Sequence, residues 1–137
     1  MADVPKILVA DDDVELLAIL SQHLRNTKCT LIEARDGEEA LALARKHVPD
    51  LMILDVMMPG LSGWEVAKRV RDDATLQNTA IIMLTAIGEA LNALTSPLYG
   101  ADEKLDKPFD FGDLDEKIKK VLAAKKARTS VPTGTKA

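Results

Sequence analysis

The 137-residue sequence has a single cysteine, Cys29, so no disulfide can form within the chain, and we expect this thiol to be structural. No apolar run approaches the roughly 20 residues that span a bilayer, and the first residues lack the charged and apolar regions of a signal peptide. Without an export signal, we expect a cytoplasmic protein. The two histidines, His23 and His47, have no second histidine or cysteine beside them to form a zinc site, and we expect both to be solvated.

Charged residues are unevenly distributed along the sequence. The formal net charge of −4 disfavours binding of nucleic acid by this domain. From Lys125 onward there are four basic residues and no acidic ones, in a stretch that also contains small polar residues, proline and glycine. We therefore predict one folded domain over residues 1–124, followed by a basic, disordered tail over residues 125–137.

Apolar runs and amphipathic segments alternate along the chain. The run 51–54 is continuously apolar, as expected for a strand buried on both faces of a parallel sheet. Strict alternation of strands and helices predicts a doubly wound α/β fold, with helices on both faces of a parallel sheet. The expected strands are 7–10, 30–34, 51–54, 80–84 and 103–106, and the expected helices are 13–25, 38–47, 64–73, 89–96 and 110–124.

Polar residues suited to chemistry follow four of these predicted strands. Asp11 and Asp12 follow the first strand, and Asp55 follows the third. Thr85 follows the fourth strand, and Lys107 follows the fifth. Ligands of open parallel sheets bind in the crevice beyond the carboxyl ends of the strands. We therefore expect these five side chains to form one site.

Three converging carboxylates repel one another unless a cation binds or their proton affinity rises. Carboxylate oxygens, with a backbone carbonyl and waters, suit the octahedral coordination of Mg²⁺. A lysine could hold a phosphoryl oxygen, and a threonine hydroxyl could donate to a second one. Such a set is suited to aspartyl-phosphate chemistry, in which a carboxylate is the nucleophile and catalysis is mostly positioning and charge neutralisation.

Each of these residues alone has a simpler interpretation. Asp11 and Asp12 could cap the first helix, as we expect of Asp13. Thr85 alone would be a strand-end hydroxyl bonded to the backbone, and Lys107 alone would be a solvated lysine. The occurrence of all of them in order at successive strand ends favours the site.

These residues resemble the motifs of the receiver domain of two-component response regulators, the CheY-like family. The resemblance runs from about residue 5 to residue 124, and it implies a flavodoxin-like fold with strand order 2-1-3-4-5 and five helices. It also implies a signalling switch that catalyses only its own phosphorylation and dephosphorylation. The stretches that carry the resemblance are Ile7 to Asp13, Asp55 to Gly63, Thr85-Ala86, and Gly100-Ala101-Asp102 through Lys107-Pro108-Phe109.

The resemblance implies that Asp55 is the phosphoacceptor. The donor would be the phosphohistidine of a histidine kinase or a phosphotransfer protein. Asp11, Asp12, Asp55 and the backbone carbonyl of Met57 would bind Mg²⁺, with Asp12 the more direct ligand and Asp11 acting through water.

By the same resemblance, Thr85 and Lys107 would contact the phosphoryl group, and the Lys107–Pro108 peptide bond is often cis. The phosphorylated domain would bind a downstream protein target. We expect a monomer or a weak dimer, with no role at a membrane.

Two positions depart from the family pattern. Lys104 stands three residues before Lys107, where the family usually has an aromatic residue that moves inward when the threonine engages the phosphoryl group. Pro97 limits the predicted fourth helix, which family members usually continue without interruption up to the Gly-Ala-Asp. Both lie on the usual output face, so we expect retained chemistry with an unusual read-out. The alternative is a protein-binding module that does not depend on phosphorylation. A phosphatase of another aspartyl-phosphate family is disfavoured, since Met57 stands where those enzymes have a second acid.

Overall fold

The structure of the protein, a computed structural model, describes residues 4–85 and 100–136, with side chains described up to residue 125. The predicted helix 89–96 lies outside these residues, as does Pro97. The described part has five strands and four helices: β1 (Lys6–Ala10), α1 (Val14–Arg25), β2 (Thr30–Ala34), α2 (Gly37–His47), β3 (Leu51–Asp55), α3 (Gly63–Asp72), β4 (Ala80–Thr85), β5 (Glu103–Asp106) and α5 (Phe111–Lys136).

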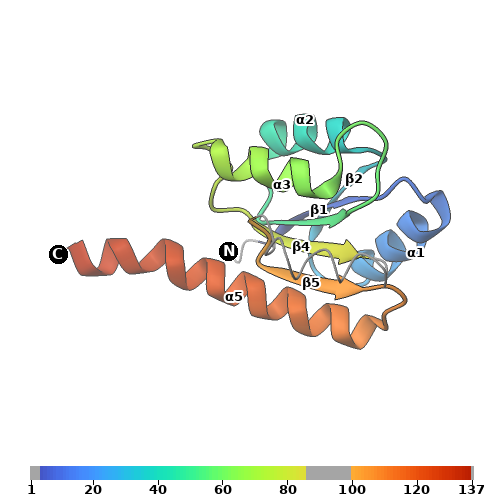
Figure 1. Ribbon diagram of the computed structural model, residues 1–137. Helices are drawn as coiled ribbons and strands as arrows, with labels where there is room; N and C mark the ends of the chain where they lie inside the picture. The colour runs from blue at the N-terminus through green and yellow to red at the C-terminus, as the bar shows by residue number, and fades with distance from the viewer. Residues whose placement is uncertain (1–3, 86–99, 137) are drawn as a thin grey trace.

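All five strands are parallel and lie in the order β2-β1-β3-β4-β5, which confirms the predicted fold class and strand order. Helices α2 and α3 pack on one face of the sheet, and α1 and α5 pack on the other (Figure 1). Every residue of β3 and β4 is buried. Cover on both faces explains why these strands are continuously apolar in the sequence.

Three helices begin at a residue whose side chain caps them. Asp13 accepts hydrogen bonds from two backbone N–H groups of the first turn of α1, at 3.1 and 3.2 Å, as predicted. Asp36 caps α2 in the same way, at 2.8 Å. Ser62 forms a capping box with Glu65 at the start of α3. These caps fix the residue at which each of the three helices begins.

The last helix is longer than predicted. Helix α5 continues to Lys136, whereas the sequence suggested an end near residue 124 and a disordered tail over residues 125–137. Residues 122–128 are leucine, alanine, lysine and arginine, which all favour helix, so no stop signal lies at residue 124. The end of α5 projects past the sheet (Figure 1). Neither α5 nor any other helix of the described residues is both long and apolar enough to cross a membrane. The division into domain and tail at residue 124 stays a prediction.

His23 is a packing residue, so the prediction that it is solvated was wrong. Its ring on α1 stacks on the ring of Phe111 on α5, with centroids 4.1 Å apart and planes inclined by 7°. Its Nε2 lies 2.9 Å from Asp115 Oδ1. The spacing along α1 does not reveal this contact, because it depends on α1 and α5 sharing one face of the sheet.

Arg71 ties α3 to the edge of the sheet that carries β4 and β5. Its guanidinium donates hydrogen bonds to the carbonyl oxygens of Gly100, Gln77 and Thr79, at 2.7, 2.8 and 2.6 Å. It also donates to Asp102 Oδ2 at 2.9 Å, and the same oxygen accepts a backbone N–H bond from β4 at 2.8 Å. The planar fork of arginine can serve all these acceptors together.

Candidate acidic site at the carboxyl edge of the sheet

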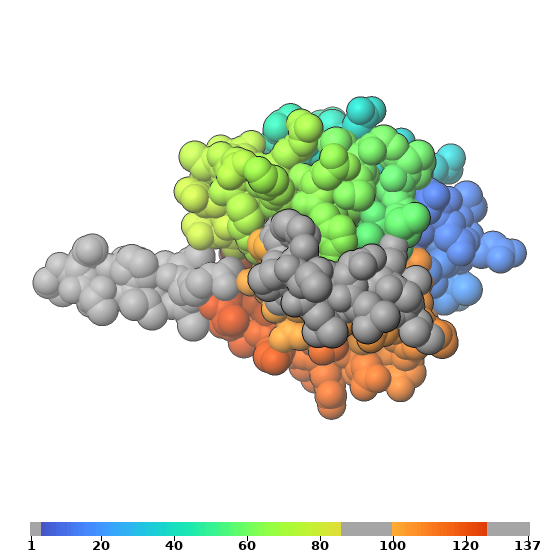
Figure 2. Space-filling model, in the orientation of Figure 1, coloured from blue at the N-terminus to red at the C-terminus, as the bar shows by residue number. Residues whose placement is uncertain are grey.

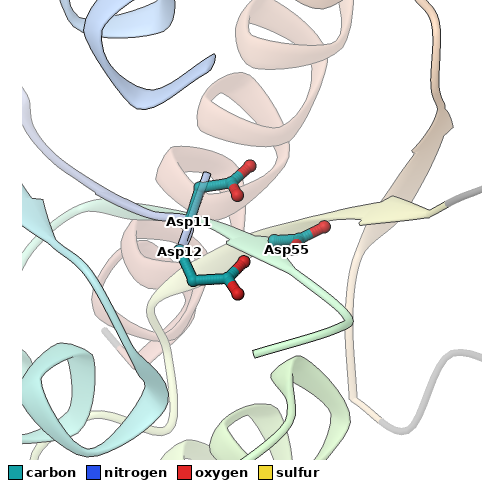
Figure 3. Close-up of side chains that lie close together, drawn as sticks. All are labelled: Asp11, Asp12 and Asp55. Carbon is teal, nitrogen blue, oxygen red and sulfur yellow. The ribbon is translucent and has the colours of Figure 1, made fainter. Parts of the chain in front are cut away.

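The carboxyl ends of two neighbouring strands bring three aspartates together. Asp55 is the last residue of β3, and Asp11 and Asp12 directly follow β1. One carboxylate oxygen of each lies within 4.8 Å of the others. The three side chains point to the same side (Figure 3). Asp11 is 0% exposed and Asp55 is 5% exposed, whereas Asp12 is open to solvent. We call these three residues the acidic cluster.

The first part of the chain meets the middle part at one end of the molecule. Figure 2 shows atoms of the N-terminal part, in blue, beside atoms of the middle part, in green, at this end. The chain therefore buries two carboxylates of the acidic cluster while leaving the third accessible from solvent.

Lys107 supplies positive charge to the acidic cluster. Its Nζ lies 2.8 Å from Asp55 Oδ1 and 3.4 Å from Asp11 Oδ2. Alternate side chains of β1, β3 and β5 face α1 and α5. Continued past the strand ends, these rows reach Asp11, Asp55 and Lys107, respectively. The pleat of the sheet thus places these three charges on the same side, although β4 separates β3 from β5. The peptide bond from Lys107 to Pro108 is cis, as the family resemblance implied.

Thr85 continues the opposite row of side chains. It ends β4 in the row of Ile81 and Met83, which packs under α2 and α3. The buried Thr85 hydroxyl donates a hydrogen bond to Asp106 Oδ1 at 2.5 Å. Asp106 is also the register partner of Thr85 in β5. Thr85 therefore lies at the same edge as the acidic cluster, with a carboxylate partner that the sequence did not suggest.

The environment shifts the proton affinity of three groups. Burial raises the pKa of Asp55 to about 6; the hydrogen bond from Lys107 opposes this rise, and the charges of Asp11 and Asp12 add to it. Burial also raises the pKa of Asp11, against the backbone N–H bond that it accepts from Asp13 at 2.9 Å. Burial lowers the pKa of Lys107, but its bond to Asp55 and the two negative charges raise it above its ordinary value. Burial and mutual repulsion thus weaken the acidity of the two buried carboxylates, and Lys107 opposes both effects.

The first turn of α3 packs against the backbone of Asp55. The Gly63 N–H donates to the Val56 carbonyl at 2.9 Å. A Cβ at position 63 would lie 2.5 Å from the Asp55 carbonyl oxygen and 2.7 Å from the Met83 sulfur, closer than side chains come. Glycine at this position therefore lets α3 approach the site. The predicted helix begins one residue later, at residue 64, and the only signal of the contact in the sequence was a glycine directly after a serine.

The composition of the acidic cluster fits a hard cation. Three carboxylates with oxygen atoms within 4.8 Å, two of them buried, face a single lysine. Carboxylate oxygens are ligands of Mg²⁺ and Ca²⁺, and a cation would reduce the repulsion among them. Met57 lies two residues past Asp55, with its side chain 66% exposed, and the metal role of its carbonyl stays a prediction.

Most of the predicted site residues meet as the sequence suggested. Asp11, Asp12, Asp55 and Lys107 come together, and Thr85 lies at the same edge. Asp106 was not among the predicted site residues. Its position one residue before Lys107 was the available signal, because Asp106 pairs with Thr85 once the register of β4 and β5 is known.

The direction of winding reverses between β1 and β3, because β2 lies on one side of β1 and the later strands follow on the other side of β3. Ligands of doubly wound sheets bind at this switch point, and the acidic cluster occupies it here. The fold and site therefore define an α/β domain with an acidic centre at its switch point.

Comparison with known proteins identifies the family within this class. The response regulator receiver domain matches residues 7–119, so the chain belongs to the receiver domain family. A receiver domain is a signalling module and not a conventional enzyme. CheY4, a chemotaxis response regulator of Vibrio cholerae, superposes with a TM-score of 0.80 at 33% sequence identity, covering 87% of this chain and 99% of that chain.

Two longer proteins also resemble the chain. The probable transcriptional regulator ycf27 of Pyropia yezoensis is 42% identical over 127 residues, which cover 92% of this chain and 51% of that protein. The alkaline phosphatase synthesis transcriptional regulatory protein PhoP of Bacillus subtilis (strain 168) is 38% identical over 117 residues, which cover 85% of this chain and 48% of that protein. The chain spans about half the length of these curated relatives.

Proposed function

We propose that this receiver domain accepts a phosphoryl group on Asp55 from the phosphohistidine of a histidine kinase or phosphotransfer protein. The phosphorylated form then binds a downstream protein differently from the unmodified form. The observation that carries the proposal is the 2.8 Å contact between Lys107 and the buried Asp55, within the acidic cluster of a chain of this family.

Asp55 has the charge and position of a nucleophile. During transfer, a carboxylate oxygen of Asp55 forms a bond to phosphorus, while the bond from phosphorus to the histidine nitrogen breaks and its electron pair stays on that nitrogen. The attacking carboxylate has to be ionised. With a pKa of about 6, about nine in ten Asp55 carboxylates are ionised at about pH 7.

Lys107 and Thr85 are the donors for the transferred group. Lys107 already lies within hydrogen-bond distance of the Asp55 oxygen, so a phosphoryl group on that oxygen comes within its reach. Its positive charge offsets negative charge on the phosphoryl oxygens. The Thr85 hydroxyl, on the neighbouring strand, is the second donor of the site.

Asp11, Asp12 and Asp55 would hold Mg²⁺, with the backbone carbonyl of Met57 as a further ligand. The exposed Asp12 leaves the solvent side open for the waters that Mg²⁺ retains. When bound, this ion supplies charge neutralisation to the carboxylates and to the phosphoryl oxygens.

An apolar hollow beside the site suits a protein donor. It has a volume of about 560 Å³ and lies between the start of α1 and the turn that leads into α5. Lys107 contributes to its wall, so the hollow adjoins the acidic cluster. Ile19 in this hollow is among the exposed large apolar residues of the molecule. Its apolar lining residues are Leu16, Ile19, Pro108, Phe109 and Phe111.

The test is phosphorylation by a small donor. The protein is incubated with acetyl phosphate and Mg²⁺, and its intact mass is measured. We expect one phosphoryl adduct, which disappears in Asp55→Asn and when Mg²⁺ is omitted. Asp72→Asn is the matched control, because Asp72 is an exposed aspartate at the far end of α3.

An adduct that persists in Asp55→Asn would place the phosphoacceptor elsewhere. No adduct, together with no spectral change on addition of beryllofluoride and Mg²⁺, would reject phosphorylation altogether. That second result would favour binding of a partner without phosphorylation, for which Lys104 in place of the usual aromatic residue is the supporting observation.

A further inference from the structure

The Thr85 hydroxyl is already engaged in the unmodified protein. It lies 2.5 Å from Asp106 Oδ1, and the two residues are register partners at the ends of β4 and β5. Thr85 is fully buried, whereas the Asp106 side chain is 49% exposed. A buried hydroxyl therefore donates to a carboxylate at the surface, on the strand next to its own.

Lys104 forms an ion pair with the same carboxylate. It lies two residues before Asp106 in β5, so both side chains project from the same face of the sheet. Its Nζ is 3.7 Å from Asp106 Oδ1, the oxygen that accepts the Thr85 bond. Position 104, which usually holds an aromatic residue in this family, thus carries a lysine that pairs with Asp106, the hydrogen-bond partner of Thr85.

A threonine hydroxyl has a single hydrogen to donate. An ionised carboxylate and a phosphoryl group on Asp55 are both acceptors, so Thr85 can donate to only one of them at a time. The Thr85–Asp106 bond has to break before Thr85 can donate to the phosphoryl group.

We propose that Asp106 is a positioning residue that holds the Thr85 hydroxyl in the unmodified protein and competes with the phosphoryl group for it. This inference rests on the proposed function, because it needs a phosphoryl group at Asp55. On phosphorylation, Thr85 turns its hydroxyl toward the phosphoryl oxygen, and Asp106 keeps Lys104 as its charged partner among the described residues. The exposed end of β5 thereby changes its hydrogen bonding without an aromatic side chain.

The competition sets how readily the active state forms. A ligand shifts a two-state equilibrium only by its differential stabilisation of the two states. The Thr85–Asp106 bond stabilises only the unmodified arrangement, so its removal should favour binding of a phosphoryl mimic. Removal of a negative charge near an anion site also favours binding, and the experiment has to separate the two effects.

A double-mutant cycle separates them. The dissociation constant for beryllofluoride, at saturating Mg²⁺, is measured for the wild-type chain, Asp106→Ala, Thr85→Val and the double variant. We expect Asp106→Ala to tighten binding by about threefold to tenfold in the wild-type background, from release of one charge-assisted hydrogen bond. In the Thr85→Val background only the charge effect remains. The gain in beryllofluoride affinity from Asp106→Ala should then be at least about threefold smaller than in the wild-type background.

Two further variants complete the design. Asp106→Asn keeps a weaker, uncharged acceptor, so we expect a smaller effect than that of alanine, again dependent on Thr85; it also serves if the alanine variant does not fold. Glu103→Ala is the matched control, because Glu103 lies on the same strand but pairs with Lys117 and Lys120 of α5. Its effect should be the same with and without the Thr85 hydroxyl.

The outcomes are distinct. An equal effect of the Asp106 substitutions in both backgrounds would overturn the competition, while leaving Asp55 as phosphoacceptor. Failure of the wild-type chain to bind beryllofluoride would overturn both the competition and the proposed function. A gain that depends on the Thr85 hydroxyl supports the assignment of Asp106.

Discussion

Replacement of Asp55 by asparagine should make the folded domain more stable at neutral pH, although it removes the proposed phosphoacceptor. Burial and the neighbouring carboxylates raise the pKa of Asp55 from 3.8 to about 6. Each pKa unit corresponds to about 1.4 kcal/mol, so the ionised carboxylate costs the native state up to about 3 kcal/mol. The amide of asparagine needs hydrogen-bond partners of its own, and we therefore expect a gain of about 2 kcal/mol.

The sign of the pH dependence follows from the direction of the shift. Between about pH 4 and pH 6, native Asp55 holds its proton more tightly than the unfolded chain does. Asp55 therefore makes the wild-type chain less stable as pH rises through this window, and its effect is constant above it. The advantage of Asp55→Asn should be small near about pH 4 and complete above about pH 7.

Urea unfolding monitored by fluorescence measures this difference. Trp64 is the only tryptophan, and it packs partly buried against the core at the start of α3. The wild-type chain and Asp55→Asn are compared at about pH 4.5 and about pH 7.5 without divalent cations, with Asp72→Asn as the exposed control. An advantage of equal size at both pH values, or a larger advantage at the lower one, would refute the reasoning.

Three other predictions follow from the geometry. The affinity of the chain for Mg²⁺ should rise with pH through about 6 and then level off, because a protonated Asp55 has to lose its proton before it binds the cation; an affinity that stays flat from about pH 5 to pH 8 would contradict this. Gly63→Ala should destabilise the domain by about 1–3 kcal/mol in urea unfolding, because its Cβ meets the Asp55 carbonyl; an unchanged midpoint would show that α3 moves freely. Arg71→Lys should lower the free energy of unfolding by about 2 kcal/mol or more in the same assay, since one ammonium cannot replace a guanidinium with four acceptors. Arg69→Lys, on the exposed side of α3, is the control and should stay within about 0.5 kcal/mol of the wild-type chain.

The sequence alone determined the fold class and most of the site. Continuous apolar runs at 51–54 and 80–84 indicated strands covered on both faces, because such runs occur where helices cover both sides of a sheet. The polar residues directly after the strands indicated the functional edge. Asp11 and Asp55 could be assigned in this way, since the carboxyl ends of parallel strands lie at one edge whatever the details of packing.

Only the tertiary structure decided which of these groups touch. The contact of Lys107 with Asp55 depends on the pleat, which places both on the α1 and α5 face across β4, and the Thr85–Asp106 bond depends on the register of β4 and β5. His23 was misjudged for the same reason, because its partners lie on a helix about 90 residues further along the chain. Residue types and spacing specify local structure and the face of each element that is buried. Contacts between distant segments depend on how the elements pack and on the register of the strands. For this reason the partner of Thr85 became known only with the register of β4 and β5.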